Sequence, residues 1–293
     1  MSAFFLGRLP RRLWRFVRRS KSHKALDLSL NDIHPLAALA RAGHRPVLIT
    51  VRLDQCRWTG ATGFPYGPDS AHPYVRTLVQ YHNGGKPAAG ESYLSRYYAS
   101  FQPRSLAEFQ GLGTDGHPLL SSLPPLNIYP WSSVSLAQLH AFLAGVGNDY
   151  ALPPSFRVVR SCGPKPADFT QARLDRLIGL YNTIKAQGFR TKLNPKLSYF
   201  DQFPVGDVMV RGTETRIILA NGQHRAAVLS ALGRESAPLL LGVVHPRGPY
   251  RIDRSAVDAW PLVRDGLYHK DQALRIFDGI FDANGQGPRS VGP

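Results

Sequence analysis

The stretch "ILANGQHRAAVLSALG", residues 218–233, constrains the fold of this chain more than any other part of the sequence. An apolar run ends at Asn221 and Gly222, and alanine, valine and leucine then recur at helical spacing. This change of period predicts a β-strand that passes through a glycine turn into an α-helix. At such a junction the unpaired backbone N–H groups of the first helical turn can bind an anion.

The polar residues of this turn suit a phosphate group. Gly222 lets a phosphate approach the backbone, Arg225 offers a planar two-pronged contact, and His224 donates a hydrogen bond or, when protonated, adds a charge. We therefore predict that phosphate is bound by the five residues Asn221, Gly222, Gln223, His224 and Arg225, and that His224 also takes part in catalysis. The alternative is a capped core helix, in which glycine and arginine have structural roles.

The rest of the second half is also regular. We expect a strand over residues 156–163, a helix over 168–189, a hairpin linked by "RGTET", a strand over 237–246 and two short helices around Pro261 and Gly266. The first half is richer in loops. There we expect a helix over residues 33–42, a strand over 45–53, an extended run over 118–131 and a helix over 135–147.

These elements predict an α/β fold, a small mixed sheet with flanking helices. We expect four segments: a basic amphipathic membrane-association segment (residues 1–24), an irregular N-terminal accessory region (25–150), a nucleotide-binding domain (151–250), and a C-terminal helical extension with a tail (251–293).

The first segment concentrates positive charge. The chain has 36 Lys and Arg against 20 Asp and Glu, a net charge of +16, and the segment before Asp27 has no acidic residue. Leu13, Trp14, Phe16 and Val17 add apolar surface, so we favour an interfacial helix on an anionic membrane. A nucleic-acid-binding arm and a disordered basic tail are the alternatives.

The remaining composition favours a cytoplasmic protein on the inner face of the membrane. No apolar run approaches the roughly 18 residues of a spanning helix. Cys56 and Cys162 lack the spacing of a zinc site or a disulfide framework, which indicates a reducing compartment.

The turn, the preceding "IKAQGF" and the following "APLLLGVV" resemble the ParB and sulfiredoxin superfamily, in which a G-x-[HR]-R turn leads into a helix that ends with Leu-Gly. The resemblance covers residues 156–244 and implies a ParB/sulfiredoxin-like fold. Members bind CTP, ATP or ADP through this turn, which implies ATP or another nucleotide as cofactor, with Mg²⁺ whose ligands are unknown. Asn221 stands where many kinase-like members have aspartate, and no ParB-type helix-turn-helix domain follows.

The segments "ESYLSRYYASFQP" and "AWPLVRDGLYHKDQALRIFDGIF" are similar to ParB-like proteins of bacterial surface-polysaccharide gene clusters. That similarity implies a sugar or a lipid-linked glycan as acceptor. Aromatic side chains in these segments could stack on a sugar, although their spacing also fits a core helix face; they are Tyr93, Tyr97, Tyr98, Phe101, Trp260 and Tyr268.

The resulting hypothesis is a nucleotide-dependent phosphotransferase (kinase) or NTPase at the membrane surface. A carboxylate has to orient the acceptor hydroxyl, and we choose Glu91, with Asp54, Asp207 and Glu214 as alternatives. The second hypothesis is a ParB-like DNA-binding or nucleotide-switched module, although no recognition-helix pair is visible. The third is a scaffold whose turn merely binds an anion.

Overall fold

The structure of the chain is a computed structural model. It describes residues 25–43, 45–60, 63–113, 116–145, 152, 156, 159, 161–190, 193–194, 199–243 and 249–284. The predicted membrane-association segment, residues 1–24, lies outside the described residues. Within these ranges, no helix combines the length and the apolar character needed to cross a membrane.

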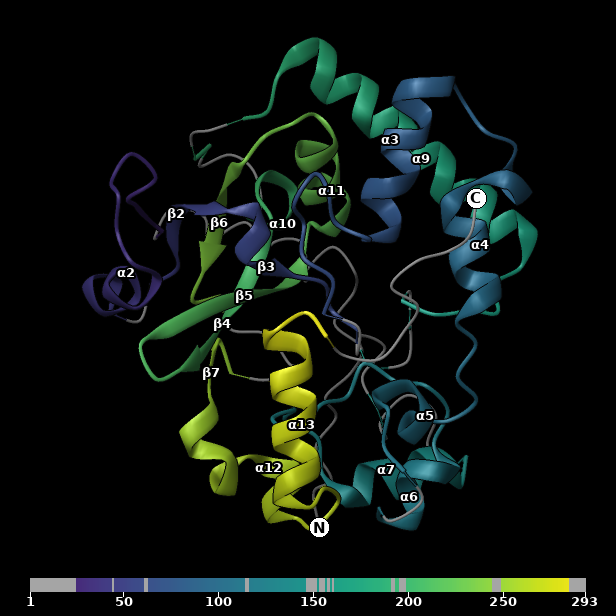
Figure 1. The fold of residues 1–293 in the computed structure, drawn as a ribbon. Coiled ribbons are helices and arrows are strands. Elements are labelled where there is room, and N and C mark those ends of the chain that lie inside the picture. The colour runs from purple at the N-terminus through teal and green to yellow at the C-terminus, as the bar shows by residue number, and fades with distance from the viewer. Residues whose placement is uncertain are drawn as a thin grey trace, which may run out of the picture.

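Seven strands of the described chain form one mixed sheet, so the α/β class is confirmed (Figure 1). β4 (Val205–Arg211) and β5 (Glu214–Asn221) form the predicted antiparallel hairpin. β2 (Val47–Arg52) runs antiparallel to β6 (Ser236–Leu241). β6 also pairs with β4, in parallel. Short parallel strands complete the sheet: β1 (Leu26–Asp27) on β2, β3 (Cys56–Arg57) on β5 and β7 (Arg251–Asp253) on β4.

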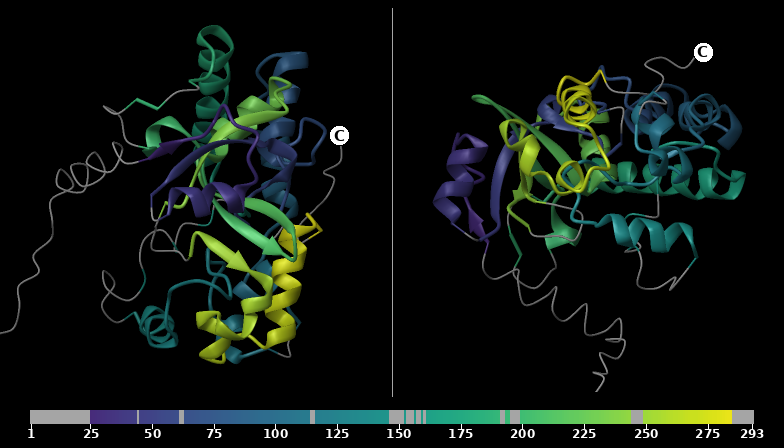
Figure 2. Two further views of the ribbon diagram at one scale, coloured as in Figure 1. Left: turned by 90° about the vertical axis from the view of Figure 1, so that its left-hand side faces the viewer. Right: turned by 90° about the horizontal axis from the view of Figure 1, so that it is seen from below.

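The helices form two groups, which Figures 1 and 2 show beside different parts of the sheet. The first group contains α3 (Pro73–Gly84), α4 (Tyr93–Ser100), α9 (Ala167–Gln187) and α11 (Gln223–Ala231), which contact one another. The second contains α5 (Leu106–Gln110), α6 (Pro118–Ser122), α7 (Leu136–Leu143), α12 (Pro261–Arg264) and α13 (Lys270–Phe281). The other helical segments are α2 (Pro35–Ala42), α10 (Tyr199–Gln202), η2 (Leu53–Gln55), η3 (Ala89–Glu91) and η4 (Arg254–Ala259).

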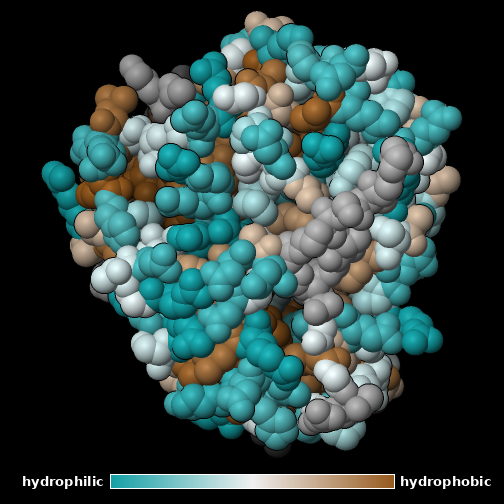
Figure 3. Space-filling model, in the orientation of Figure 1, coloured by the Kyte–Doolittle hydropathy of each residue, from teal (hydrophilic) through white to brown (hydrophobic). Residues whose placement is uncertain are grey.

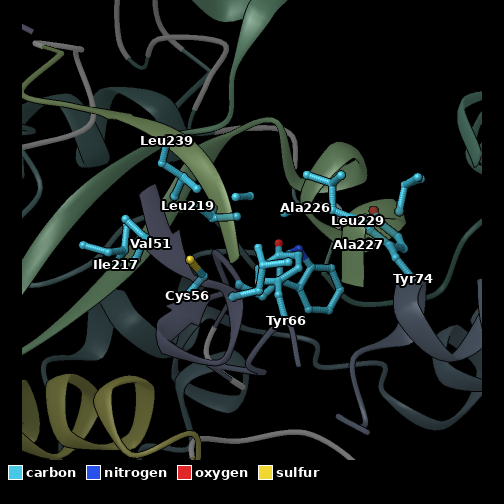
Figure 4. Packing of buried hydrophobic residues seen from close by; sticks show 14 of the residues in the cluster. Val51, Cys56, Tyr66, Tyr74, Ile217, Leu219, Ala226, Ala227, Leu229 and Leu239 are labelled. Atoms are coloured by element: carbon cyan, nitrogen blue, oxygen red, sulfur yellow. The ribbon is translucent and has the colours of Figure 1, made fainter. Parts of the chain in front are cut away.

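Each helix group shares a hydrophobic core with one face of the sheet. On β5, Ile217 and Leu219 pack in the core of the first group, whereas Ile218 packs in the core of the second. Figure 4 shows part of the first core. This alternation follows from the two-residue period of a strand. With both cores filled, hydrophilic residues predominate on the face seen in Figure 3. The predicted site lies where β5 ends against the first group of helices.

Two predicted elements are wrong in part. The run over residues 118–131 is not extended throughout, because Pro118 begins α6 instead of preventing it. Proline is well suited to the first helical turn, where its missing N–H costs nothing, and the His117 side chain accepts a hydrogen bond there from the N–H of Leu119. The strand expected over residues 156–163 is not seen in its described part, since residues 161–163 form a bend.

One sheet joins the two middle segments of the chain. Three of its strands, β1, β2 and β3, come from residues 25–150, and β4, β5 and β6 come from residues 151–250. The sheet therefore extends across the predicted limit at residue 150.

Candidate functional site

The turn between β5 and α11 depends on a glycine, as the sequence predicts. β5 ends at Asn221, and α11 begins at Gln223. Between them Gly222 has a φ of +77°, and a Cβ atom built on it would lie 2.5 Å from the Cα atom of Pro204. Asn221 stabilises the turn, because its Oδ1 accepts a hydrogen bond of 2.7 Å from the backbone N–H of Gly222. No described side chain caps the first turn of α11.

Gln223 holds this turn against the segment that follows β3. Its Oε1 accepts a hydrogen bond of 3.2 Å from Nε1 of Trp58. Its Nε2 donates to Oγ1 of Thr59 and, at 3.3 Å, to the carbonyl oxygen of Leu219. Both ends of the amide are thus used within the protein, so the geometry gives this side chain a structural role.

His224 lies between two helices of the first group. Its ring stacks on Tyr74 of α3, with centroids 4.9 Å apart and planes 22° apart. Its Nε2 lies 3.0 Å from Nη1 of Arg173 on α9. A guanidinium can only donate hydrogen bonds, so Nε2 acts as the acceptor and the proton of a neutral ring is on Nδ1. The contact with Arg173 therefore favours neutral imidazole.

Two arginines at this site carry charges away from bulk water. Arg173 is only 8% exposed, and its guanidinium carbon lies 5.0 Å from the centre of the Phe169 ring. Burial lowers the pKa of Arg225 to about 10; Arg176 lowers it further, while Asp201 raises it. A buried charge is costly unless an opposite charge or hydrogen bonds compensate it. Nε of Arg173 has no hydrogen-bond partner among the described residues, and an anion bound beside it would supply that compensation.

The sequence interpretation missed Arg173 and Tyr74, which both contact His224. One signal was present: Phe169, Arg173, Leu177 and Tyr181 recur every four residues, so Arg173 interrupts an otherwise apolar helix face. A charged residue in such a stripe is unusual unless it is paired or functional. Which residue it meets could not be read from the spacing, because His224 lies 51 positions away in the chain.

The predicted carboxylates have other surroundings. Glu91 is exposed in η3, and its carbonyl oxygen accepts a hydrogen bond of 3.1 Å from Nε2 of Gln80. Asp54 forms an ion pair of 2.6 Å with Arg52, and Glu214 forms one of 3.3 Å with Arg211. Asp207 is buried in β4. Their described contacts do not connect them with the turn, and the role of Glu91 stays a prediction.

Most of the aromatic candidates belong to the cores. Five of these side chains are buried, as expected if they pack in a core instead of stacking on a sugar: Tyr93, Tyr97, Tyr98, Trp260 and Tyr268. Tyr97 also donates a hydrogen bond of 2.8 Å to the carbonyl oxygen of Ser161, and Tyr268 donates one of 2.9 Å to Oε1 of Gln110. These contacts leave little surface for a sugar.

The cysteines and the carboxylates give no metal site in the part of the chain that the structure describes. Cys56 and Cys162 are free and buried, and burial raises the pKa of Cys56 to about 12 and that of Cys162 to about 11. Within the described ranges, no three His, Cys, Asp or Glu side chains are grouped so that they could hold a metal ion. The described residues therefore do not define a binding site for the expected Mg²⁺.

Comparisons with protein-family models, with curated proteins and with solved structures found no match.

Proposed function

We propose that the turn from Asn221 to Arg225 binds a phosphate group of a nucleotide, and that the protein is a nucleotide-dependent phosphotransferase or NTPase. The observation that supports this most is the approach of buried Arg173 to His224 at the start of α11. Arginine can contact phosphate oxygens through two parallel hydrogen bonds, and a helix N-terminus favours negative charge. Phosphoryl transfer depends mainly on this kind of positioning and charge neutralisation.

The roles of the side chains follow from their chemistry. Arg173 and Arg225 neutralise the phosphate, and neutral His224 donates through its Nδ1 proton. The acceptor is the hydroxyl of a sugar or a lipid-linked glycan, with Glu91 as the proposed base. The family resemblance of the turn supports a nucleotide as the phosphate donor. The similarities of the flanking segments support a glycan as the acceptor. No step is assigned to Mg²⁺, because the described donor set does not identify its ligands.

The first prediction concerns Arg225. Arg225→Met keeps most of the side-chain volume and removes a charge-assisted phosphate contact, which is worth about 1.5–3 kcal/mol, or about ten- to a hundredfold in affinity. The melting temperature checks that the variant is folded. Calorimetric titration with a nucleotide panel in the presence of Mg²⁺ measures the affinity. An assay for phosphate release or transfer measures turnover.

The matched control is Arg190→Met, which removes an exposed arginine just beyond the end of α9. This variant should bind the nucleotide as the wild type does. If Arg225→Met is less stable but binds with unchanged affinity, then the arginine has only a structural role. A wild-type protein that binds no nucleotide contradicts the proposed function as a whole.

The second prediction concerns residues 1–24, for which we propose association with an anionic membrane. Each of eight basic residues near such a surface contributes about 1 kcal/mol at most, and partial insertion of apolar side chains adds to this. A protein without residues 1–24 should no longer sediment with vesicles that contain phosphatidylserine. If the truncated and full-length proteins sediment equally, the segment is not the anchor.

The net charge of +16 supports a second candidate function, a ParB-like module that binds DNA. Salt-sensitive binding to duplex DNA that depends on residues 1–24, without binding to vesicles, favours this candidate. Binding to vesicles but not to DNA favours the proposed membrane association of residues 1–24.

A further inference from the structure

The helices α9 and α11 lie side by side and run in the same direction. At one end Arg173 contacts His224, the second residue of α11, at 3.0 Å. At the other end Ile184 of α9 and Leu229 of α11 line one hollow. Because α9 begins at Ala167, six residues before Arg173, its first turns extend about 9 Å beyond the start of α11. An anion bound at the start of α11 therefore lies beside these first turns, residues 167–172, which we call the overhang.

Two cations lie at the two ends of the overhang, on one side of it. Phe169 and Arg173 are four residues apart on α9 and continue the row of Leu177, which packs in the core beside α11. The guanidinium carbon of Arg173 lies 5.0 Å from the centre of the Phe169 ring. Nζ of Lys165, two residues before the helix, lies 5.8 Å from the same centre. The row that faces α11 thus leads from one cation to the other.

No carboxylate of the described chain forms an ion pair with either cation. Nε of Arg173 belongs to a side chain that is only 8% exposed, and it has no hydrogen-bond partner among the described residues. Lys165 is half-buried. The nearby Asp168 uses its Oδ1 to accept a hydrogen bond of 2.8 Å from the backbone N–H of Phe169. Buried polar atoms usually have partners, so the pair of cations indicates an anionic ligand that the chain itself does not supply.

We propose that Lys165 is a further phosphate-binding residue, and that the site takes a polyphosphate whose chain runs from the start of α11 past Arg173 to Lys165. This inference rests on the proposed phosphate site and specifies its ligand class. One phosphate is bound by the backbone N–H groups of α11 and by Nε of Arg173, and an outer phosphate contacts the ammonium group of Lys165. A single phosphate held at the start of α11 occupies only the Arg173 end of the row.

The test compares tripolyphosphate with orthophosphate, which share their chemistry but differ in length. Dissociation constants are measured by calorimetric titration of the full-length protein at constant ionic strength without Mg²⁺. Lys165→Met keeps an aliphatic stem beside Phe169 and removes the ammonium group. It should weaken tripolyphosphate binding about fivefold to tenfold, because one charge-assisted contact is lost, and should change the affinity for orthophosphate by less than about twofold.

The matched control is Lys185→Met, which removes a lysine whose Nζ lies 5.8 Å from the centre of the Tyr181 ring, near the other end of α9. This variant should bind tripolyphosphate as the wild type does. Lys165→Gln provides the same test if Lys165→Met is not folded. A folded Lys165 variant that binds tripolyphosphate like the control, or that loses affinity for both anions equally, overturns the role of Lys165 and leaves the phosphate site in place. If the wild type binds neither anion, the phosphate site itself is wrong.

Discussion

His72 has very different surroundings in the folded protein and in the unfolded chain. It is fully buried among aromatic rings, and its Nδ1 accepts a hydrogen bond of 3.1 Å from the N–H of Tyr74, which caps α3. No partner of its Nε2 occurs among the described residues. Burial lowers the pKa of His72 to about 3. The folded protein therefore holds this histidine neutral.

The third prediction follows from that shift. Between the ordinary pKa of 6.5 and about 3, the unfolded chain binds a proton at His72 that the folded protein does not. Stability is therefore lost as the pH falls through this window, by about 1.4 kcal/mol for each unit below 6.5. His72→Asn replaces the capping Nδ1 with an amide oxygen that can also accept a hydrogen bond, but it cannot titrate. Urea unfolding at pH 7 and pH 5 should show a loss about 2 kcal/mol smaller in the variant than in the wild type. If both proteins show the same pH dependence, the loss of stability at low pH does not come from His72.

Individual site residues differ in how well the sequence could reveal them. Gly222, His224 and Arg225 could be chosen because the turn and the helix start are local patterns. Arg173 could not, because its role depends on α9 packing against α11, a contact between distant parts of the chain. The phosphate contact that the sequence predicts for Gln223 stays a prediction; its side-chain amide contacts Trp58 and Thr59, which the sequence does not place beside it.

At the scale of elements, the junction of β5 and α11 depends on the chain bending sharply beside Pro204. The fourth prediction is that Gly222→Ala costs more stability than Gly212→Ala. Both glycines have positive φ, +77° and +61°, so alanine causes backbone strain at each. Only at Gly222 does the added Cβ atom meet the backbone, 2.5 Å from the Cα atom of Pro204, while at Gly212 it meets nothing within 4 Å.

We expect Gly222→Ala to be less stable than Gly212→Ala by about 1–3 kcal/mol, the usual cost of overpacking, as measured by urea unfolding. Equal losses would mean that Pro204 can move aside and that only the backbone conformation matters. The comparison uses the hairpin turn between β4 and β5 as its control, because that turn has the same strain without the close approach.

Elements were predictable where a local pattern decides them. The hairpin and the change from β5 to α11 follow from the apolar period, which neighbouring residues set without tertiary contacts. The run from Pro118 was misjudged because proline both disfavours a helix before it and favours one that starts at it. The alternation over residues 156–163 predicted a strand, but a strand also needs a pairing partner, and no sequence pattern provides one.

At the scale of the whole molecule, the central sheet connects parts of the chain that the sequence suggested were separate. Along its whole length β2 pairs with β6, from Val47 opposite Leu241 to Arg52 opposite Ser236. The core beside α11 likewise contains residues from both segments: Trp58 and Tyr74 from the first, and Leu219 and Val228 from the second. Trp58 and Tyr74 also contact the turn, so the first half of the chain contributes directly to the site.

The last prediction is that residues 151–250 do not fold alone. Without residues 25–150, β6 loses the partner on one of its edges and β5 loses β3, while the apolar faces of α9 and α11 lose their contacts with α3. An unpaired strand edge and an uncovered apolar surface destabilise a small domain and promote aggregation. The fragment should therefore give poorly dispersed amide resonances and no cooperative unfolding transition, whereas a protein of residues 25–284 should give both a dispersed spectrum and a cooperative transition. A folded 151–250 fragment would show instead that this segment is an independent domain and that the strands of the first half are accessory to it.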